Sequence, residues 1–249
     1  MTHRFFIDPN LITPPTVHII GDTARQIKTV LRMQPGDTII VLDNSGLERQ
    51  VQLTDIDKNS VQGQIIAEQM NTAEPALHLT LYQGTLKGSK FEWVLQKGTE
   101  IGISCFVPTI CQRSVIKDAT ALAKKASRWQ QIIQEAAEQS GRGKLPTLAP
   151  ACALNDALEH AQTANRIILP WEEAANNPLK QILANFDDSH LALFIGPEGG
   201  FSADEVQRAR RQNAEIVSLG PRILRAETAA LAASTVIFYE FETYALSVE

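Results

Sequence analysis

The sequence has few cysteines and no long apolar run. Its three cysteines, Cys105, Cys111 and Cys152, form no CxxC spacing within 249 residues. An odd number without such spacing argues against a disulfide framework or a zinc ribbon and favours a reducing cytoplasm. The longest apolar stretches, 191–195 and 229–239, fall well short of the roughly 20 residues that a membrane helix needs. Residues 1–8 also lack the apolar segment of a signal peptide, so we expect a cytoplasmic protein.

Several common catalytic and cofactor motifs are missing as well. The sequence contains no GxxxxGK[ST] phosphate loop, no GxGxxG dinucleotide fingerprint, no HExxH zinc motif and no GxSxG nucleophile elbow. Its five histidines are scattered along the chain. These absences predict that the protein holds no metal and that any ligand is not held by phosphate groups.

Charge is unevenly distributed along the chain. The formal net charge is -5, yet residues 113–144 carry seven basic and three acidic side chains, so this segment is at +4. A local basic face on an acidic protein can attract a polyanion, because the electrostatic field is local. An ordinary solvated helix face explains the same pattern, so charge alone leaves both interpretations open.

Residues 1–72 have the pattern of a small β-rich module. Asn44-Ser45-Gly46 is a turn signal between two β-branched stretches, which predicts a hairpin. We expect strands at residues 37–43, 48–53 and 61–67, and a short helix at 22–33 with Asp22 as its cap. The polar residues 70–75, which end in proline, are the expected linker to the rest of the chain.

From residue 73 onward, short apolar strands alternate with helical sequence. This rhythm predicts a parallel sheet covered by helices on both faces. We expect strands at residues 77–83, 106–110, 166–169, 191–195 and 215–219. We also expect a helix at 91–101 and a long one at 119–140, in which apolar residues recur every three or four positions: Leu122, Ala126, Trp129, Ile133 and Ala136. Ser202-Ala-Asp-Glu205 matches a capping box that opens a further helix.

Three of the expected strands run into proline, at Leu169-Pro170, Gly196-Pro197 and Gly220-Pro221. Proline lacks the N–H that a strand ladder needs, so the chain must leave the sheet at these points. The carboxyl ends of parallel strands meet at one edge, where open α/β sheets bind ligands. The middle exit, residues 195–201, contains three glycines that allow close backbone approach to a ligand. One Gly-Pro pair is usually only a turn, but three together predict a ligand site.

Two of these exits also carry a family resemblance. Phe194-Ile-Gly-Pro-Glu-Gly-Gly-Phe-Ser202 and Leu219-Gly-Pro-Arg-Ile-Leu-Arg-Ala-Glu-Thr-Ala229 resemble the signature segments of the RsmE family of bacterial 16S ribosomal RNA uridine N3-methyltransferases, in the SPOUT superfamily. Arg4-Phe5-Phe6, residues 87–102 and residues 135–142 match as well, so the resemblance spans the chain. Gly98 stands where alanine is expected, at a local cost of about 1 kcal/mol in a helix. The first exit, Pro170-Trp171-Glu172, lies where the family varies.

The resemblance implies an α/β fold with two domains. Residues 73–249 would form a C-terminal trefoil-knotted SPOUT methyltransferase domain, and residues 1–72 an N-terminal PUA-like RNA-binding β-barrel. It also implies S-adenosyl-L-methionine as the cofactor, a homodimer, and 16S ribosomal RNA or the small ribosomal subunit as the substrate. The knot does not follow from the pattern of strands and helices, because threaded chains are nearly absent among folds.

The resemblance assigns candidate residues to three roles. The cofactor, which has no phosphate, would bind loop amides and an apolar slot made by Leu169, Ile195, Gly196, Pro197, Gly199, Gly200, Leu219, Gly220, Ile223 and Leu224, although core packing also explains the aliphatic residues. RNA would contact Arg4, Lys87, Lys90, Arg113, Arg142 and Lys144, with stacking on Phe5 or Phe6. Solvated surface is the alternative explanation for each of these basic residues.

The catalytic candidates follow from the chemistry of uracil. Its N3 carries a proton that must be removed before a methyl group can be accepted. Glu198 and Glu227 are candidates for the base, and Arg225 or Arg222 for the positive partner, with Arg225 favoured because it precedes a helix. Glu227 could instead be a first-turn acid that faces the helix dipole, and Glu198 could simply order its loop.

Two other functions stay open. A SPOUT enzyme could methylate a different RNA position, such as a ribose hydroxyl or guanine N1. The chain could also be a non-catalytic RNA-binding factor for ribosome assembly. An unrelated α/β enzyme with a nucleotide cofactor is disfavoured by the missing phosphate motifs.

Overall fold

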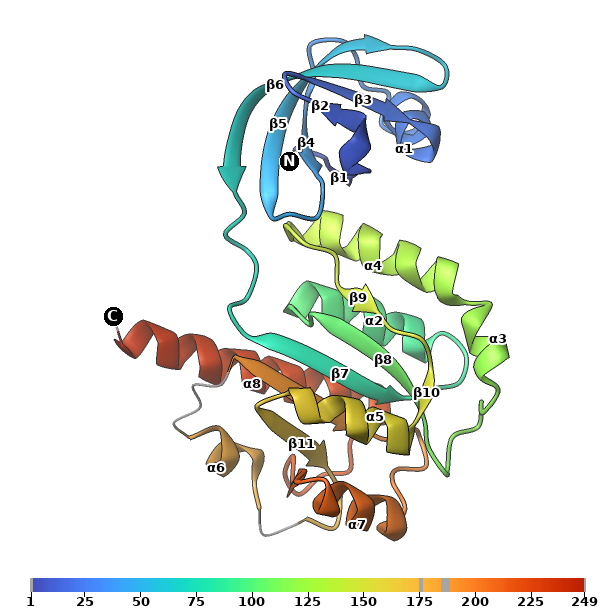
Figure 1. Ribbon diagram of the computed structural model, residues 1–249, viewed down its shortest axis with the longest axis vertical. Helices are drawn as coiled ribbons and strands as arrows, with labels where there is room; N and C mark the ends of the chain where they lie inside the picture. The colour runs from blue at the N-terminus through green and yellow to red at the C-terminus, as the bar shows by residue number, and fades with distance from the viewer. Residues whose placement is uncertain (1, 175–176, 185–188, 249) are drawn as a thin grey trace. The chain divides into compact units, whose positions relative to one another are not determined.

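The computed structural model describes residues 2–174, 177–184 and 189–248, and the chain divides into two compact units (Figure 1). The first unit contains Met1–Glu74 together with Ala137–Leu145, and the second contains Pro75–Ala136 and Pro146–Glu249. A segment from the middle of the chain therefore belongs with the N-terminal unit.

The first unit is a six-stranded sheet that curls around a main core. The strands follow the order β1-β4-β5-β6-β3-β2, and only the β1–β4 pair is parallel. Phe5 of β1, Val17 of β3 and Val51 of β5 pack in the same buried cluster, so the sheet must curl. The strand bounds are β1 Arg4–Phe6, β2 Ile12–Thr13, β3 Thr16–Ile20, β4 Thr38–Leu42, β5 Leu47–Ile56 and β6 Ser60–Met70.

The predicted strands at 37–43, 48–53 and 61–67 are confirmed as β4, β5 and β6. The predicted helix at 22–33 is wrong in detail. Helix α1 covers only Gly21–Arg25, and the chain continues directly into a π-helical turn at Gln26–Val30. A short 3₁₀ turn, η1, lies earlier in the chain at Pro9–Leu11. Asp22 does not cap it, because Ile20 holds the cap position and Asp22 pairs with Arg25.

The second unit contains a sheet in which all pairs are parallel, as predicted. The strand order is β10-β8-β7-β12-β11-β13, with β9 also paired to β8. The bounds are β7 His78–Gly84, β8 Cys105–Ile110, β9 Thr147–Leu148, β10 Cys152–Ala153, β11 Arg166–Pro170, β12 His190–Ile195 and β13 Glu215–Val217. The strands that lead into the three proline exits, β12, β11 and β13, are neighbours in this order.

Helices cover both faces of this sheet (Figure 1). On one face, Leu191 and Leu193 of β12 pack with helices α2, α4, α6 and α8, and on the other, Ala192 and Phe194 pack with α5 and α7. Alternate residues of one strand therefore serve two separate cores, as a doubly covered sheet requires. The helix bounds are α2 Lys90–Ile101, α3 Ala119–Ala123, α4 Ala126–Ser140, α5 Leu154–His160, α6 Leu179–Leu183, α7 Ala203–Arg211 and α8 Ala226–Val248, with a 3₁₀ turn at Ala161–Thr163.

Three helix predictions can be compared directly. The capping box is confirmed: the Ser202 hydroxyl accepts from the Glu205 N–H, and the Glu205 carboxylate accepts from the Ser202 N–H. The long helix expected at 119–140 is broken after Ala123 into α3 and α4. At Gly98 of α2, an added Cβ would lie 2.8 Å from Phe106, so glycine permits close packing there and its helix cost is offset.

Candidate active site

A cleft of about 230 Å³ lies where the three exit loops of the second unit meet. Its walls come from the segments that follow β11, β12 and β13, together with the first turn of α8. The lining residues are Pro170, Trp171, Glu172, Ile195, Gly196, Pro197, Glu198, Gly199, Gly200, Phe201, Ser218, Leu219, Gly220, Arg222, Ile223, Leu224, Ala226 and Ala229. The prediction that three proline exits converge over one sheet edge is thus confirmed.

The loop after β12 is tightly folded against its neighbours. Gly200 N–H donates to Pro197 O at 2.9 Å, and Gly200 has φ +67°, where a side chain would be strained. A Cβ at Gly84, at the end of β7, would lie only 2.4 Å from Pro197 N. The buried amide of Gln83 donates to Gly196 O at 3.3 Å. The end of β7 therefore supports the wall of the cleft that is formed by the loop after β12.

The other two loops are tied to each other. Trp171 N–H donates to Val217 O at 2.9 Å, and Gly220 N–H donates to the Ser218 hydroxyl at 3.1 Å. Gly220 has φ +112°, so the turn into residues 221–225 also needs glycine. The Glu172 carboxylate faces Gly200, since a Cβ there would lie 3.4 Å from its Oε1. Backbone hydrogen bonds therefore hold these two loops in place, in addition to side-chain packing.

Most of the predicted cofactor residues line this cleft. Leu169 differs, because it is fully buried in the core between the sheet and α5 and α7. Ile223 does line the cleft, although 90% of its surface is exposed. The remaining predicted residues of this set contribute to the walls: Ile195, Gly196, Pro197, Gly199, Gly200, Leu219, Gly220 and Leu224.

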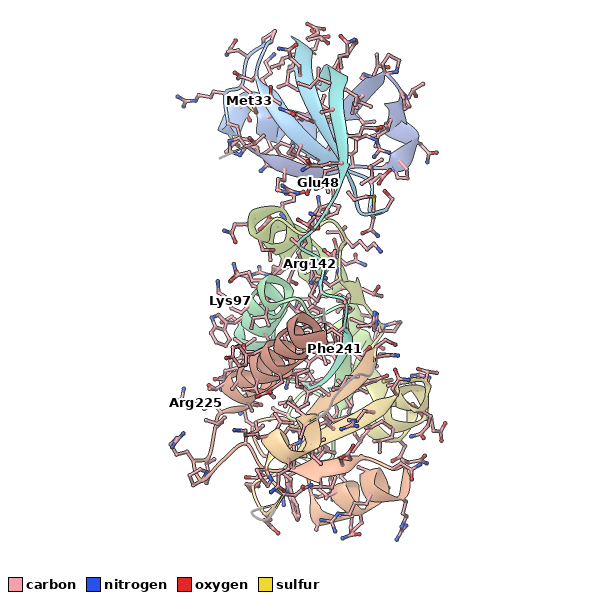
Figure 2. All side chains as sticks on the ribbon, turned by 90° about the vertical axis from the view of Figure 1, so that its left-hand side faces the viewer. Met33, Glu48, Lys97, Arg142, Arg225 and Phe241 are labelled. Atoms are coloured by element: carbon pink, nitrogen blue, oxygen red, sulfur yellow. The ribbon has the colours of Figure 1, made fainter. Side chains whose placement is uncertain are left out.

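The three predicted catalytic residues lie in different places. Glu198 lines the cleft, whereas Glu227 lies beside it in the first turn of α8. Arg225 just precedes α8 and is exposed, and Figure 2 shows it reaching away from the body of the unit. Arg222 does line the cleft. The structure therefore brings Glu198 and Arg222 to the cleft and leaves Arg225 outside its walls.

A lysine joins the two carboxylates. Lys90 Nζ lies 3.4 Å from Glu227 Oε1 and 3.7 Å from Glu198 Oε1. Glu198 Oε1 also accepts a hydrogen bond from the Lys87 N–H at 3.0 Å. We call Lys90, Glu198 and Glu227 the charged triad. It carries one positive and two negative charges at the border of the cleft.

The predicted RNA-binding residues fall into exposed and paired groups. Lys87, Arg113 and Lys144 are exposed, although the Arg113 guanidinium also donates to Gly199 O at 2.8 Å. Arg4 is paired with Glu48, and Arg142 has only 4% of its surface exposed and binds both oxygens of Glu74. Lys90 belongs to the charged triad. Because the Arg142 guanidinium is buried, it is not available to contact RNA at the surface.

The expected stacking role of Phe5 and Phe6 is wrong. Phe5 is buried in the core of the first unit, and Phe6 packs with Leu42 and Ala137 in a second small cluster. A ring can stack on a base only when its face is accessible. In strand β1 both aromatic rings point into packed clusters instead.

Several cleft residues were not among the predicted site residues, and most of them directly follow the three exits. Trp171 and Glu172 come after Pro170, and Phe201 ends the glycine-rich loop. The rule that strand ends carry ligand sites would have included them. Ser218, Ala226 and Ala229 carry no comparable signal. Among residues 2–174, 177–184 and 189–248, no group of three metal-ligating side chains occurs, and no described helix could span a membrane.

The cleft suits a small ligand with apolar and positively charged parts. Ile195, Leu219 and Leu224 provide an apolar surface, and the glycines expose backbone amides and carbonyls. Glu172 and Glu198 offer negative charge, and Arg222 offers one positive charge. Mixed walls with a few directed polar groups are typical of small-molecule sites. A polyphosphate would need more cationic groups than this cleft provides.

Comparison with protein families agrees with this description. The RNA methyltransferase domain family matches residues 73–238, and the RNA methyltransferase PUA domain family matches residues 19–66. The fold and cleft are thus those of an RNA methyltransferase with a PUA domain. Ribosomal RNA small subunit methyltransferase E of Bacillus subtilis is 34% identical over 96% of this chain and 97% of its own length. The chain belongs to this ribosomal RNA small subunit methyltransferase E family.

Solved structures show the same relationship. The small subunit methyltransferase E from Neisseria gonorrhoeae, bound to S-adenosyl methionine, has a TM-score of 0.86 and 30% identity, covering 95% of this chain and 97% of that one. A methyltransferase from Legionella pneumophila with bound cofactor SAM has a TM-score of 0.86 and 29% identity, with the same coverage. Both likenesses extend over the two units.

Proposed function

We propose that this protein transfers a methyl group from S-adenosylmethionine to N3 of a uridine in 16S ribosomal RNA of the small subunit, in the cytoplasm. The cleft formed by three converging loops carries this proposal, because it combines the family's signature segments with walls suited to a phosphate-free ligand. The relatives named above share this architecture over nearly their whole length.

The residues of the cleft fit this cofactor. Its adenine and ribose would take the apolar surface of Leu219 and Leu224 and the amides near Gly196 and Gly220. Its two cationic parts, the sulfonium and the amino group, match the carboxylates of Glu172 and Glu198. Its carboxylate matches Arg222. When bound, the cofactor supplies an electrophilic methyl group on sulfur.

The protein's own contribution is positioning and proton transfer. The cleft would align the acceptor with the methyl group, and such alignment can supply about 7–11 kcal/mol of a barrier. Uracil N3 lies on the base-pairing edge, so the target base must be unpaired or flipped out. Its proton would pass to Glu198 or Glu227, with Arg222 or Arg225 balancing the developing charge.

RNA would be held by both parts of the chain. We propose that the module of residues 1–72 is an RNA-binding domain and residues 73–249 the catalytic domain, in line with the matched families. The exposed cations Lys87, Arg113 and Lys144 are the candidates for phosphate contacts. Arg4 and Arg142 are omitted, because both are engaged in ion pairs.

A homodimer and a knotted backbone complete the proposal. Trp93 of α2 and Val236 and Tyr239 of α8 are exposed on helices that pack side by side, which supports a self-association surface. The trefoil knot is proposed because the chain belongs to this methyltransferase family. Light scattering of the purified protein measures the dimer directly, and a monomeric mass would refute it.

The methylation proposal is tested with labelled S-adenosylmethionine and small-subunit RNA, both naked and in assembled particles. We expect label in one nucleoside that mass spectrometry identifies as N3-methyluridine. Label in a ribose hydroxyl or guanine N1 would indicate a different SPOUT activity. A failure to bind the cofactor in calorimetry would indicate a non-catalytic RNA-binding factor.

A further inference from the structure

The charged triad contains a carboxylate oxygen that has no hydrogen-bond partner among the described residues. Glu227 has 13% of its side chain exposed, and its Oε1 faces Lys90. Its other oxygen, Oε2, is buried and accepts no hydrogen bond from any described residue. A buried, unpaired carboxylate oxygen is costly to fold. Such a group within an ordered ion pair indicates that it serves a donor supplied from outside the chain.

Glu198 is used differently. Its Oε1 already accepts the Lys87 N–H and also faces Lys90, and its side chain is 26% exposed. These contacts connect the glycine-rich loop to the segment that leads into α2. The Lys87 N–H and Lys90 therefore hold Glu198 in the wall of the cleft, whereas the buried Oε2 of Glu227 accepts no hydrogen bond from any described residue.

We propose that Glu227 accepts the N3 proton of the target uracil and that Lys90 is the positioning residue that orients it. The inference rests on the proposed function and decides between its two candidate bases. The N3–H bond breaks, and the proton goes to Glu227. The electron pair left on N3 forms the new bond to the methyl carbon, while the pair of the broken carbon–sulfur bond stays on sulfur.

Lys90 has two effects on this step. Its ammonium group restrains Glu227 through Oε1, so that Oε2 is not taken up by the ion pair. It also places a fixed positive charge near the uracil as negative charge develops on the ring. A first-turn acid that only faced the dipole of α8 would need neither a lysine partner nor a buried free oxygen.

The test compares Glu227→Gln and Glu198→Gln, with Glu100→Gln as a matched control. Glu100 pairs with Lys97 on the same helix, α2, outside the cleft. At saturating substrates we expect Glu227→Gln to lower kcat by about 10²–10⁴-fold, the usual contribution of a general base. Its remaining rate should rise about tenfold per pH unit, because hydroxide must then remove the proton. Glu198→Gln should lower kcat by less than about tenfold and mainly weaken cofactor binding.

Lys90 is tested by Lys90→Met and Lys90→Arg, with RNA binding measured alongside turnover. We expect Lys90→Met to lower kcat with little change in the RNA dissociation constant, and Lys90→Arg to restore most of the rate. An RNA affinity that falls in parallel with turnover would make Lys90 an RNA contact and overturn its positioning role. Calorimetry should give unchanged S-adenosylmethionine affinity for Glu227→Gln.

Failure of the inference and failure of the proposed function are distinguishable. Wild-type protein that produces no N3-methyluridine refutes the function. Wild-type protein that does so, with Glu227→Gln equally fast or a larger kcat loss in Glu198→Gln, refutes the inference and leaves the function standing.

Discussion

Substituting alanine for Gly84 should damage the cleft from beneath. Gly84 ends β7, and a Cβ there would lie 2.4 Å from Pro197 N and 2.7 Å from Gly196 C. These are backbone atoms, so no side-chain rotation can relieve the collision. Gly84 does not have positive φ, and alanine would otherwise be favoured in a strand by about 0.5–1 kcal/mol. Any loss of stability therefore measures the collision with the loop.

The size of the effect follows from overpacking. Forcing one extra methyl group into a well-packed site costs typically about 1–3 kcal/mol. If the 195–201 loop moves away to avoid the collision, it must return before the cofactor can bind. The whole cost then falls on binding, and the affinity for S-adenosylmethionine decreases about 5- to 150-fold. If the loop instead keeps its position, the free energy of unfolding falls by about the same 1–3 kcal/mol.

Isothermal calorimetry and urea denaturation of Gly84→Ala measure the two outcomes. Gly21→Ala is the control, because Gly21 has φ +70° but nothing within 4 Å of an added Cβ. That variant should lose about 1–2 kcal/mol from backbone strain, with cofactor affinity unchanged. Wild-type affinity together with wild-type stability in Gly84→Ala would refute the argument from close approach.

Three further predictions concern stability and reactivity. Ser202→Ala removes a helix cap and should cost about 1 kcal/mol in urea denaturation; an unchanged midpoint would contradict this. Burial tends to raise the Glu74 pKa, but hydrogen bonds and the charge of Arg142 outweigh it, so the net pKa is lowered. The stability that Glu74 contributes is therefore complete above its ordinary pKa of about 4.3 and is lost as pH falls through the lower folded-state pKa. Glu74→Gln should lose up to about 3–5 kcal/mol at pH 7 and flatten the acid limb of a stability–pH curve; an unaltered acid limb would contradict it. Burial raises the pKa of Cys105 to about 11 and also raises that of Cys111, so mass spectrometry should find both thiols resistant to iodoacetamide at pH 8 until urea is added.

The parallel sheet and its ligand edge could be predicted from sequence because both depend on local signals. Buried strands appear as short apolar runs, and a proline after such a run marks where the chain leaves the sheet. The three exits, at Pro170, Pro197 and Pro221, therefore indicate where the cleft lies. The π-helical turn after α1 and the break between α3 and α4 have no such marker, because tertiary packing decides them.

Contacts between distant segments could not be predicted. Lys90 meets Glu198 and Glu227 only because the starts of α2 and α8 lie next to the loop after β12. From the sequence alone, Lys90 is therefore a candidate RNA contact, and Glu227 is one of two candidate bases. Gly84 gave no signal either, since a glycine at a strand end does not reveal which backbone passes over it.

A count of charges along the sequence overstates how many cations are available to bind RNA. Residues 113–144 carry +4, but Arg142 pairs with Glu74 and Arg128 pairs with Glu92, and both of these acids lie outside the segment. Including the two acids reduces the local charge to +2. The salt slope is the slope of log K for binding against log salt concentration. Each phosphate contact contributes about 0.9 to the size of this slope for a duplex and about 0.7 for a single strand. Arg142 is buried and cannot contact RNA. Lys144 is exposed, so Lys144→Gln should reduce the salt slope of RNA binding. Arg128 is paired with Glu92, so Arg128→Gln should reduce the slope less. Equal reductions would mean that the Arg128–Glu92 pair opens to admit RNA.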